Sequence, residues 1–432
     1  MAPSFSQIQD DASVNRIFII GGGIVGAALA FYLSGSNVDK QIVVLDKSLG
    51  SLSGSTGYAP GFVGQFNTST ALTTLAKDTV KEYLSIPGGF DSVGGLELSS
   101  TLTGAENLEQ RCSLAKEAGL PAEILSPEKA AALAPDFVKT ESVTSALHFP
   151  TDGTANATII TNYFRQKAQD RGAVFLETNI TSLKAERAGS ITAISTTQGQ
   201  LQTGSNPVIL CTGIWTQSLL QSASIATKTP IPIIPVAHPY TYTPSRPRRS
   251  GPAYPFVRWP EHTVYARDHG DCDGLGSYNH APSKVANLPN SAVGDWPTEF
   301  ESVLGEACRT CLKNGDQFLT TNQGDSEVTD KRRPFNGIFS MTPDNLPLAG
   351  KVEDVQNLWV CAAVWVTHAA GTAKLIARQI LLEHGGGGDG GEEEDGVLLE
   401  ALDPNRFKGG DLEVLTREAV GKYNDIYNKE EA

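Results

Sequence analysis

The chain opens with the pattern of a buried strand followed by that of a helix. Residues 16–20, R-I-F-I-I, form an apolar, β-branched run that is typical of a parallel strand buried on both faces. A glycine-rich turn at 21–26 and small apolar residues at helical spacing in 27–33 come next. A second apolar run at 41–45 ends at Asp46. This order predicts a β-α-β unit at the start of the fold.

The rest of the chain alternates between strand-like, helix-like and proline-rich stretches. Residues 371–382 carry a strong helix pattern, and four further apolar runs predict strands at 173–176, 191–194, 207–210 and 358–362. Between 229 and 336 prolines and aromatic residues become frequent and helical periodicity fades, which is typical of an antiparallel sheet. The sequence therefore predicts an α/β fold, in which a discontinuous Rossmann-like domain carries an inserted α+β substrate domain built on an antiparallel sheet.

The predicted domain boundaries follow these changes in pattern. We assign 1–95, 145–230 and 335–432 to the cofactor-binding domain, and 96–144 and 231–334 to the substrate-binding domain. Glycine and glutamate dominate residues 384–396. Such a segment cannot bury enough apolar surface to order itself, so we expect a flexible surface loop there.

The glycine turn is the strongest chemical motif. Gly21, Gly23 and Gly26 have the G-x-G-x-x-G spacing directly after the first strand, and Asp46 closes the second. Gly21 allows the tight turn, Gly23 lets the backbone approach a pyrophosphate, and Gly26 lets helix and strand pack closely. The helix N-terminus faces the negative charge, and Asp46 would accept hydrogen bonds from the ribose hydroxyls. The motif predicts a dinucleotide site.

Other stretches favour FAD over a nicotinamide cofactor. Asp46 disfavours NADP, whose 2′-phosphate would face a carboxylate. The small-residue loop at 54–61 suits an isoalloxazine and its ribityl chain, and 211–215, C-T-G-I-W, resembles a turn common in FAD oxidases. Gly371 opens a helix that could aim a second positive dipole end at the flavin. The predicted cofactor-binding residues are Gly21, Gly23, Ile24, Val25, Gly26, Asp46, Lys47, Ser55, Thr56, Gly57, Tyr58, Ala59, Ile180, Thr212, Gly213, Trp215, Gly337, Trp365, Thr367 and His368.

Composition narrows the setting. The net charge of −14 disfavours nucleic acid and anionic membranes as partners. Six cysteines without a disulfide or zinc pattern favour a reducing compartment and predict no metal site. The first 16 residues lack the apolar core of a secretory signal, and no apolar run approaches the roughly 18 residues of a membrane span. We therefore expect a cytoplasmic location; the oligomeric state stays open.

Blocks along nearly the whole chain resemble one family. They are 19–23, 54–61, 235–238, 265–271, 274–278, 335–344 and 363–371. In this order they are similar to the FAD-dependent amine oxidoreductases of the D-amino-acid oxidase superfamily, and most resemble the flavin half of dimethylglycine oxidase, dimethylglycine dehydrogenase and sarcosine dehydrogenase. The resemblance implies a Rossmann-like FAD-binding domain and a small-molecule amine substrate.

Two departures from the family change the expectation. The folate domain that follows in the dimethylglycine enzymes has no counterpart before residue 432, so folate-coupled capture of a one-carbon unit is not expected. Many relatives hold FAD covalently through a histidine where this chain has Tyr58. The cysteine that holds FAD in monomeric sarcosine oxidase would fall near Gly337, so both usual covalent anchors are absent. The resemblance therefore implies dissociable, non-covalent FAD, with a tyrosyl link through Tyr58 as the alternative.

The resemblance also implies residue roles. His238 and Tyr265 match the active-site histidine and tyrosine of the dimethylglycine oxidase family, and a histidine can take an ammonium proton near neutral pH. The predicted substrate-binding residues are Arg267, Tyr278 and Arg333. The two arginines are chosen because a guanidinium binds a substrate carboxylate through two parallel hydrogen bonds. Lys331, Arg332 and Arg333 replace an acidic stretch of the relatives, which puts dimethylglycine itself in doubt.

The resulting interpretation is an FAD-dependent oxidase or dehydrogenase that oxidises the C–N bond of a secondary or tertiary amine or amino acid, of N-methyl or cyclic imino type. Hydride transfer to flavin would give an imine, with O₂ as the expected acceptor and H₂O₂ as product, although an electron-transfer protein is also open. Two alternatives remain. One is an FAD-dependent monooxygenase, which would consume NAD(P)H, and the other is a flavin-binding protein without amine oxidase activity.

Overall fold

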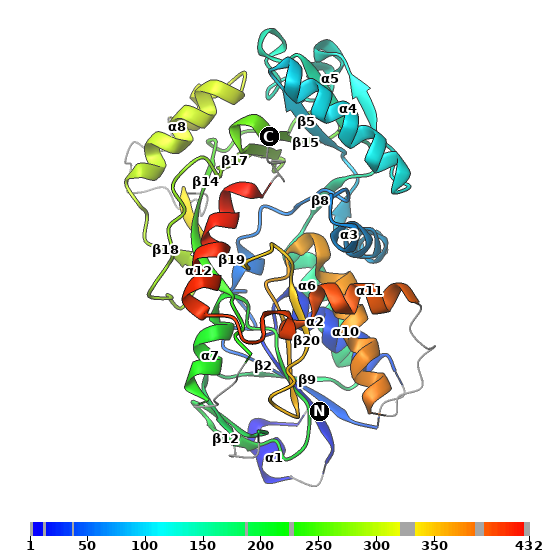
Figure 1. Cartoon of the computed structure of the whole chain (residues 1–432), viewed down its shortest axis with the longest axis vertical. Coiled ribbons are helices and arrows are strands. Elements are labelled where there is room, and N and C mark those ends of the chain that lie inside the picture. Colours follow the sequence, from blue (N-terminus) through cyan, green and yellow to red (C-terminus); the bar gives the residue numbers. More distant parts are fainter. Residues whose placement is uncertain are drawn as a thin grey trace.

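The computed structural model describes residues 3–11, 14–36, 39–185, 189–223, 229–319, 333–384 and 393–426. In this part of the chain two large sheets dominate (Figure 1), and two smaller sheets of three strands each flank them. The chain starts at the lower end of Figure 1, beside the first large sheet, and the helices labelled α4 and α5 lie at the upper end. The predicted α/β class is confirmed.

The first large sheet holds the predicted β-α-β unit. In spatial order its six strands within the described residues are β20 (Leu348–Lys351), β21 (Leu358–Ala362), β13 (Val208–Leu210), β1 (Arg16–Ile20), β2 (Gln41–Asp46) and β9 (Val174–Glu177). All neighbours are parallel except β20, which pairs antiparallel with β21 at one edge. Because β1 lies between β2 and β13, the turn after β1 opens where the strand order reverses direction, the usual ligand site of such sheets.

Helices cover one face of this sheet. They are α2 (Ile24–Ser34), α3 (Thr70–Tyr83), α6 (Ala157–Asp170), α10 (Ala369–Glu383) and α11 (Glu393–Leu402). The central helix α2 packs against both α6 and α10, and most of its residues are buried. Ile17 and Ile19 face this helical layer, whereas Phe18 and Ile20 face a second core. That second core is covered by α1 (Phe5–Asp10), α7 (Thr216–Ser222) and the small sheet of β10 (Ile180–Ala185), β11 (Ile191–Thr196) and β12 (Gly199–Gln202).

The second large sheet is mostly antiparallel. Its nine described strands, in spatial order, are β18 (Val293–Gly294), β19 (Phe335–Met341), β14 (Ile234–Tyr242), β17 (Asp273–Ser277), β16 (Val264–Asp268), β15 (Phe256–Trp259), β5 (Gly95–Ser99), β7 (Ser145–Phe149) and β6 (Glu123–Leu125). The remaining helices are α4 (Leu102–Glu117), α5 (Pro127–Leu133), α8 (Glu299–Cys311), α9 (Asp316–Leu319) and α12 (Leu412–Gly421). The second small sheet has three short strands, in the spatial order β3 (Phe62–Val63), β8 (Gly153–Ala155) and β4 (Phe90–Asp91).

The described elements differ from the expected boundaries in four places. Strands β7 and β19 belong to the nine-stranded sheet, although the predicted boundaries give their residues to the cofactor domain. The helix α12, also in that predicted domain, packs on β14. The chain is helical again from Glu393, so the loop predicted for 384–396 is too long at its end; residues 385–392 lie outside the described residues. In each case a tertiary contact decides the placement, which local composition cannot show.

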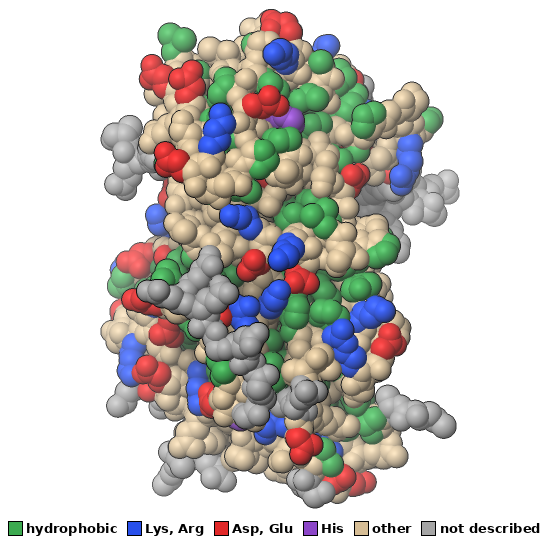
Figure 2. Space-filling view, turned by 90° about the vertical axis from the view of Figure 1, so that its right-hand side faces the viewer, with side chains coloured by type: hydrophobic (Ala, Val, Ile, Leu, Met, Phe, Trp, Pro, Cys, Tyr) green, Lys and Arg blue, Asp and Glu red, His purple; other side chains and the backbone are tan. Residues whose placement is uncertain are grey.

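Surface and general properties add little. Basic and acidic side chains are interspersed on the face shown in Figure 2, despite the net negative charge. Among the described residues no helix has the length and apolar character needed to cross a bilayer. The same residues contain no cluster of three or more histidine, cysteine or acidic side chains placed to hold a metal ion.

Candidate active site

A cavity of about 560 Å³ runs between the two large sheets. At one end the glycine turn after β1 lines it, and at the other end His238, Tyr265 and Arg258 line it from the nine-stranded sheet. The middle is lined by the segment 52–61 and by residues 361–368 after β21. The cavity is therefore long, and its two ends come from different kinds of structure.

The glycine turn is packed too tightly for side chains. Gly21 has φ +102°, and a Cβ there would lie 2.3 Å from the carbonyl oxygen of Cys211. A Cβ on Gly26 would lie 1.9 Å from the carbonyl oxygen of Gly21, because α2 begins hard against β1. Gly23 caps α2 in an extended conformation without a side-chain hydrogen bond. The turn therefore brings the backbone at the N-terminus of α2 to the cavity without intervening side chains, which suits a pyrophosphate.

Asp46 holds the turn as well as lining the cavity. Its carboxylate accepts hydrogen bonds from the backbone N–H of Gly22 at 2.6 Å and of Ser48 at 2.7 Å. From the other side the guanidinium of Arg165 donates to the carbonyls of Gly22 and Leu49. Beside the acid, the ammonium of Lys47 lies 3.7 Å above the ring of Trp215. A carboxylate oxygen accepts more than one hydrogen bond, so Asp46 can serve the turn and a ribose together.

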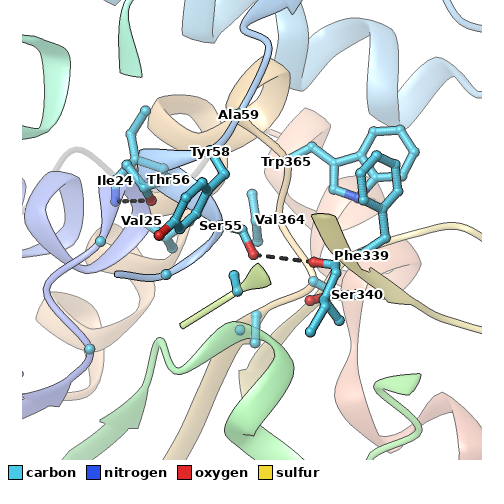
Figure 3. Close-up of a pocket in the computed structure, with 18 of the residues that line it drawn as sticks. Ile24, Val25, Ser55, Thr56, Tyr58, Ala59, Phe339, Ser340, Val364 and Trp365 are labelled. Atoms are coloured by element: carbon cyan, nitrogen blue, oxygen red, sulfur yellow. Dashed lines mark hydrogen bonds between the residues drawn. The ribbon is translucent and has the colours of Figure 1, made fainter. Parts of the chain in front are cut away.

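Polar and apolar side chains both line the middle of the cavity (Figure 3). The hydroxyl of Thr56 accepts the N–H of Ile24 at 3.1 Å, and that of Ser55 donates to the carbonyl of Ile338 at 3.5 Å, so the two point to opposite walls. Trp365 and Phe339 form an aromatic wall with ring centroids 6.0 Å apart. Bare backbone at one end, an acid beside it and an apolar slot farther on fit an extended dinucleotide with a flat ring. The residues present therefore fit FAD.

Glycines make room for the aromatic residues at the far end. Tyr265 on β16 pairs across the sheet with Gly276 on β17, and a Cβ on that glycine would lie 2.3 Å from the tyrosine ring. His238 on β14 pairs with Gly337 on β19, where a Cβ would lie 3.3 Å from the ring of Phe335. A glycine within a strand often marks a close approach by another group. Here Gly276 makes room for the ring of Tyr265, and Gly337 for that of Phe335.

The two predicted catalytic residues form a pair. The distance between His238 Nε2 and the hydroxyl of Tyr265 is 2.8 Å, and their rings are parallel within 6°. His238 is 1% exposed. Its burial, and to a smaller extent the charge of a nearby His280, holds its pKa well below the usual value. The imidazole is therefore neutral at pH 7 and can accept a proton.

A guanidinium lies next to this pair. Arg258 on β15 is directly opposite Tyr265 in the antiparallel register, so both side chains leave the same face of the sheet. Arg258 and Arg111 share the carboxylate of Glu97, with N–O distances of 3.4 Å and 2.8 Å. Burial raises the pKa of Glu97, but the two guanidinium groups outweigh it, and the net shift is downward. A fixed planar cation thus lines the cavity beside the histidine–tyrosine pair.

An acid of unusual pKa lies near the same cation. Asp152 is 3% exposed and accepts the N–H of Gln65 at 2.9 Å. Burial raises its pKa to about 7, against the opposing effects of the Gln65 N–H and of the Arg258 charge. The charge beside Arg258 therefore changes near neutral pH.

The structure brings most of the predicted site residues to this one cavity. Those that line it are His238, Tyr265, Tyr278, Gly21, Gly23, Ile24, Val25, Asp46, Lys47, Ser55, Thr56, Tyr58, Ala59, Ile180, Thr212, Gly213, Trp215, Gly337, Trp365, Thr367 and His368. Gly26 and Gly57 support its walls, since Cβ atoms there would meet the carbonyls of Gly21 and Leu52.

Two predicted substrate residues lie elsewhere. The guanidinium of Arg267 donates to the carbonyl of Pro60 and packs over Gly61, so it holds the loop and does not line the described cavity. Arg333 is exposed, also away from the described cavity residues. Arg332 lies outside the described residues.

Sequence reasoning missed the residues that tertiary packing brings in. They are Arg258, Arg165, Tyr240 and Phe339, which line the cavity, and Tyr423, whose hydroxyl lies 2.6 Å from His238 Nδ1. A cation seven residues before Tyr265 was a possible signal for Arg258, since a two-stranded hairpin would place them together. Nothing local marks Tyr423, which comes from the far C-terminal part of the chain.

Comparisons with known proteins agree with this geometry. The family described as FAD dependent oxidoreductase, DAO, matches residues 16–379. Human dimethylglycine dehydrogenase, a mitochondrial protein, is 27% identical over 429 residues, which cover 96% of this chain and 47% of the relative. The formaldehyde-forming 4-methylaminobutanoate oxidase of Paenarthrobacter nicotinovorans is 23% identical over 431 residues, covering 94% and 48%. This chain therefore spans about half the length of these relatives.

A solved structure extends the match to the fold. L-proline dehydrogenase from P. horikoshii superposes with a TM-score of 0.74 and 23% identity, covering 92% of this chain and 99% of that one. At this identity the likeness shows the fold. The predicted Rossmann-like architecture, the family resemblance and the FAD cofactor are confirmed.

Proposed function

The chain belongs to the family of FAD-dependent oxidoreductases, and on that premise we propose that it oxidises the C–N bond of an amino acid whose nitrogen is secondary or tertiary. N-methyl and cyclic imino acids are the substrate class. The product is an imine, which hydrolyses to an amine and a carbonyl compound. Relatives that act on dimethylglycine and on 4-methylaminobutanoate support an N-alkyl substrate.

One observation carries the proposal. Arg258 on β15 and Tyr265 on β16 are directly opposite in the register, so their side chains lie side by side, and His238 is hydrogen-bonded to the tyrosine. A guanidinium recognises a carboxylate through two parallel N–H bonds, and a neutral imidazole accepts an ammonium proton. The two groups that an amino acid needs are therefore presented side by side at one end of the cavity. Arg258 takes the substrate-anchoring role that the sequence suggested for Arg267 and Arg333.

The chain's own residues then orient and deprotonate the substrate. Arg258 fixes the carboxylate, because Glu97 and the rings of Phe62 and Phe256 hold its guanidinium in place. Tyr265 and His238 remove the ammonium proton so that the nitrogen lone pair becomes available. Phe339 and Trp365 line the wall and exclude water.

The glycine turn, Asp46 and the 55–59 segment would hold FAD, and bound there it supplies the two-electron acceptor for the C–N bond. We propose that the cofactor is not covalently attached, because Tyr58 stands where related proteins have a histidine. We further propose O₂ as the final acceptor, with H₂O₂ as product. The six free cysteines support a reducing, cytoplasmic location.

An anaerobic screen tests the substrate class. The purified holoprotein is mixed with N-methyl amino acids and cyclic imino acids, each paired with the amine that lacks the carboxylate, and loss of flavin absorbance is followed. We expect the acids to reduce the flavin and the matched amines to do so much more slowly. Readmitting air with a peroxide assay then tests O₂ as acceptor.

Variants of the arginine sharpen the screen. Arg258→Met removes the guanidinium but keeps an apolar stem, and should weaken the apparent affinity for the acids about tenfold to a hundredfold, the usual scale for a hydrogen bond to a charged group. It should leave the response to the matched amines unchanged. Arg333→Met is the control, since that side chain is exposed. Equal loss for acids and amines would remove Arg258 from carboxylate recognition.

The alternatives give different results. A flavin-binding protein without amine oxidase activity would show no flavin reduction with any amine. A monooxygenase would consume NADPH in proportion to substrate. The proposed function fails in either case.

A further inference from the structure

The histidine–tyrosine pair is the inner end of a longer hydrogen-bonded chain. His238 Nδ1 lies 2.6 Å from the hydroxyl of Tyr423, and that hydroxyl lies 2.7 Å from Nε2 of His280. His280 Nδ1 in turn lies 2.9 Å from the carbonyl oxygen of Ala281. The hydrogen bonds thus lead from the cavity, which Tyr265 lines, to the partly exposed His280. Their order is Tyr265, His238, Tyr423, His280.

Tyr423 is supplied by a different part of the chain. It lies in the short helix η8 (Lys422–Asp425) that follows α12, the red helix beside β19 in Figure 1. α12 packs on β14, the strand of His238. Asn424 fastens this segment, because its amide donates to the carbonyls of Tyr278 at 2.6 Å and of His280 at 3.0 Å. Tyr423 is fully buried as a result.

The outer carbonyl sets the direction of every bond. A carbonyl oxygen only accepts, so His280 Nδ1 carries the hydrogen, and Nε2 of the neutral ring is an acceptor. Tyr423 must then donate to His280, and its oxygen accepts the Nδ1–H of His238. His238 Nε2 is left as an acceptor, so Tyr265 donates to it. Tyr265, which lines the cavity, therefore donates its hydrogen to His238, away from a bound substrate.

We propose that Tyr423 and His280 complete a proton exit path, which carries the ammonium proton of the substrate from Tyr265 and His238 to the protein surface. This inference rests on the proposed function, because it needs an ammonium substrate. Tyr423 and His280 are positioning residues in this path, since neither lines the described part of the cavity.

In this transfer each group that loses a proton gains one from its neighbour, and no electrons are transferred. The substrate N–H proton goes to the Tyr265 oxygen, and the Tyr265 proton goes to His238 Nε2. The Nδ1 proton of His238 goes to the Tyr423 oxygen, and the Tyr423 proton goes to His280 Nε2. One ammonium becomes an amine and His280 becomes an imidazolium, which releases a proton to water. Rotation of the two hydroxyls together with a flip of each imidazole ring, which returns the hydrogen to the Nδ1 position, restores the starting direction.

The surroundings favour His280 as the outer end. It is partly exposed, whereas His238 is buried. Burial lowers the pKa of both rings, but for His280 the Ala281 carbonyl and the charge of Glu299 act in the opposite direction. Aromatic rings also pack around the chain, among them Phe300, 4.9 Å from His280, and Tyr278 and Phe339 around His238. A proton is therefore better tolerated at His280 than at His238.

The first test uses Tyr423→Phe, which keeps the ring and removes the bridging hydroxyl. Imidazole ¹⁵N NMR of the holoprotein without substrate should show His238 and His280 as Nδ1–H tautomers in the wild type. In the variant His238 loses its fixed Nδ1–H state, whereas His280 keeps it. Tyr163→Phe, on α6, is the matched control and should change neither ring. His238 as an Nε2–H tautomer in the wild type would overturn the assigned direction.

The second test follows the rate of anaerobic flavin reduction against pH. At low pH, where the substrate is an ammonium ion, Tyr423→Phe and His280→Gln should slow reduction at least about tenfold, part of the usual contribution of proton transfer. At high pH, where the substrate is already a free amine, the limiting rates should equal that of the wild type. A uniform loss at every pH, or no loss at any pH, would overturn the exit path. If no amine reduces the flavin, the proposed function fails, whereas the tautomers still decide the hydrogen-bonded chain.

Discussion

The two ends of the cavity are built by opposite means. At the glycine end the cavity wall is the backbone of one short segment, residues 21–26, held by Asp46 and Arg165. At the other end the groups are side chains, His238, Tyr265 and Arg258, from three strands of the nine-stranded sheet. A backbone site depends on the absence of side chains, and a side-chain site depends on register between distant strands. Substitutions at the two ends should therefore fail in different ways.

The largest effect is expected from Gly26→Ala. The added Cβ would lie 1.9 Å from the carbonyl oxygen of Gly21, so the turn and α2 must separate and the pyrophosphate site is lost. The purified variant should be colourless, as the ratio of flavin to protein absorbance will show. Gly50→Ala is the control, since a Cβ there meets no atom within 4 Å. A yellow Gly26→Ala protein with full flavin content would show that the close packing is not needed.

At the side-chain end we expect loss of rate with the flavin retained. His238→Ala removes the proton acceptor and should slow anaerobic flavin reduction by about 10²-fold or more, the usual scale for losing a proton-transfer group. His262→Ala, outside the described cavity, should leave the rate unchanged. The rate of flavin reduction in both variants is measured by stopped-flow absorbance. An unchanged rate in His238→Ala would remove this residue from the mechanism.

A smaller effect should follow pH. Burial raises the pKa of Asp152 to about 7, so below that pH the group is neutral. Above that pH Asp152 is a carboxylate near Arg258, and its negative charge repels the carboxylate of a ligand. Binding of a simple carboxylate such as acetate should therefore weaken as pH rises through about 7. The change is up to about tenfold, the ratio that one pKa unit of coupling produces.

Titration of the flavin spectrum with acetate measures this dependence. In Asp152→Asn it should disappear, because no charge develops beside Arg258, while the variant still binds acetate. A pH dependence that survives in Asp152→Asn would assign it to another group.

The smallest effect concerns Tyr58. Acid precipitation of the wild type should release yellow FAD into the supernatant, and Tyr58→Phe should behave in the same way, because no covalent bond is expected there. Colour that stays in the wild-type pellet and leaves it in Tyr58→Phe would identify a tyrosyl link instead.

The contrast between the two ends also explains what the sequence could predict. Strands 16–20 and 358–362 agree with the structure residue for residue, since parallel strands buried on both faces appear as unbroken apolar runs. The glycine turn is local and carries its own spacing. Arg267 was predicted instead of Arg258 because the register of the β15–β16 hairpin, which places Arg258 opposite Tyr265, follows from the folded sheet and not from a local motif. Tyr423 could not be predicted, because only the packing of α12 on β14 brings it to His238.

The placement of η8 has a consequence for biosynthesis. The turn that receives the cofactor leaves the ribosome early, yet its neighbour Cys211 follows β13, the wall at 361–368 comes far later, and Tyr423 comes after both. A nascent chain thus has no complete pocket until translation has passed these segments. Flavin loading and closure of the reaction chamber therefore have to wait until these segments have been synthesised.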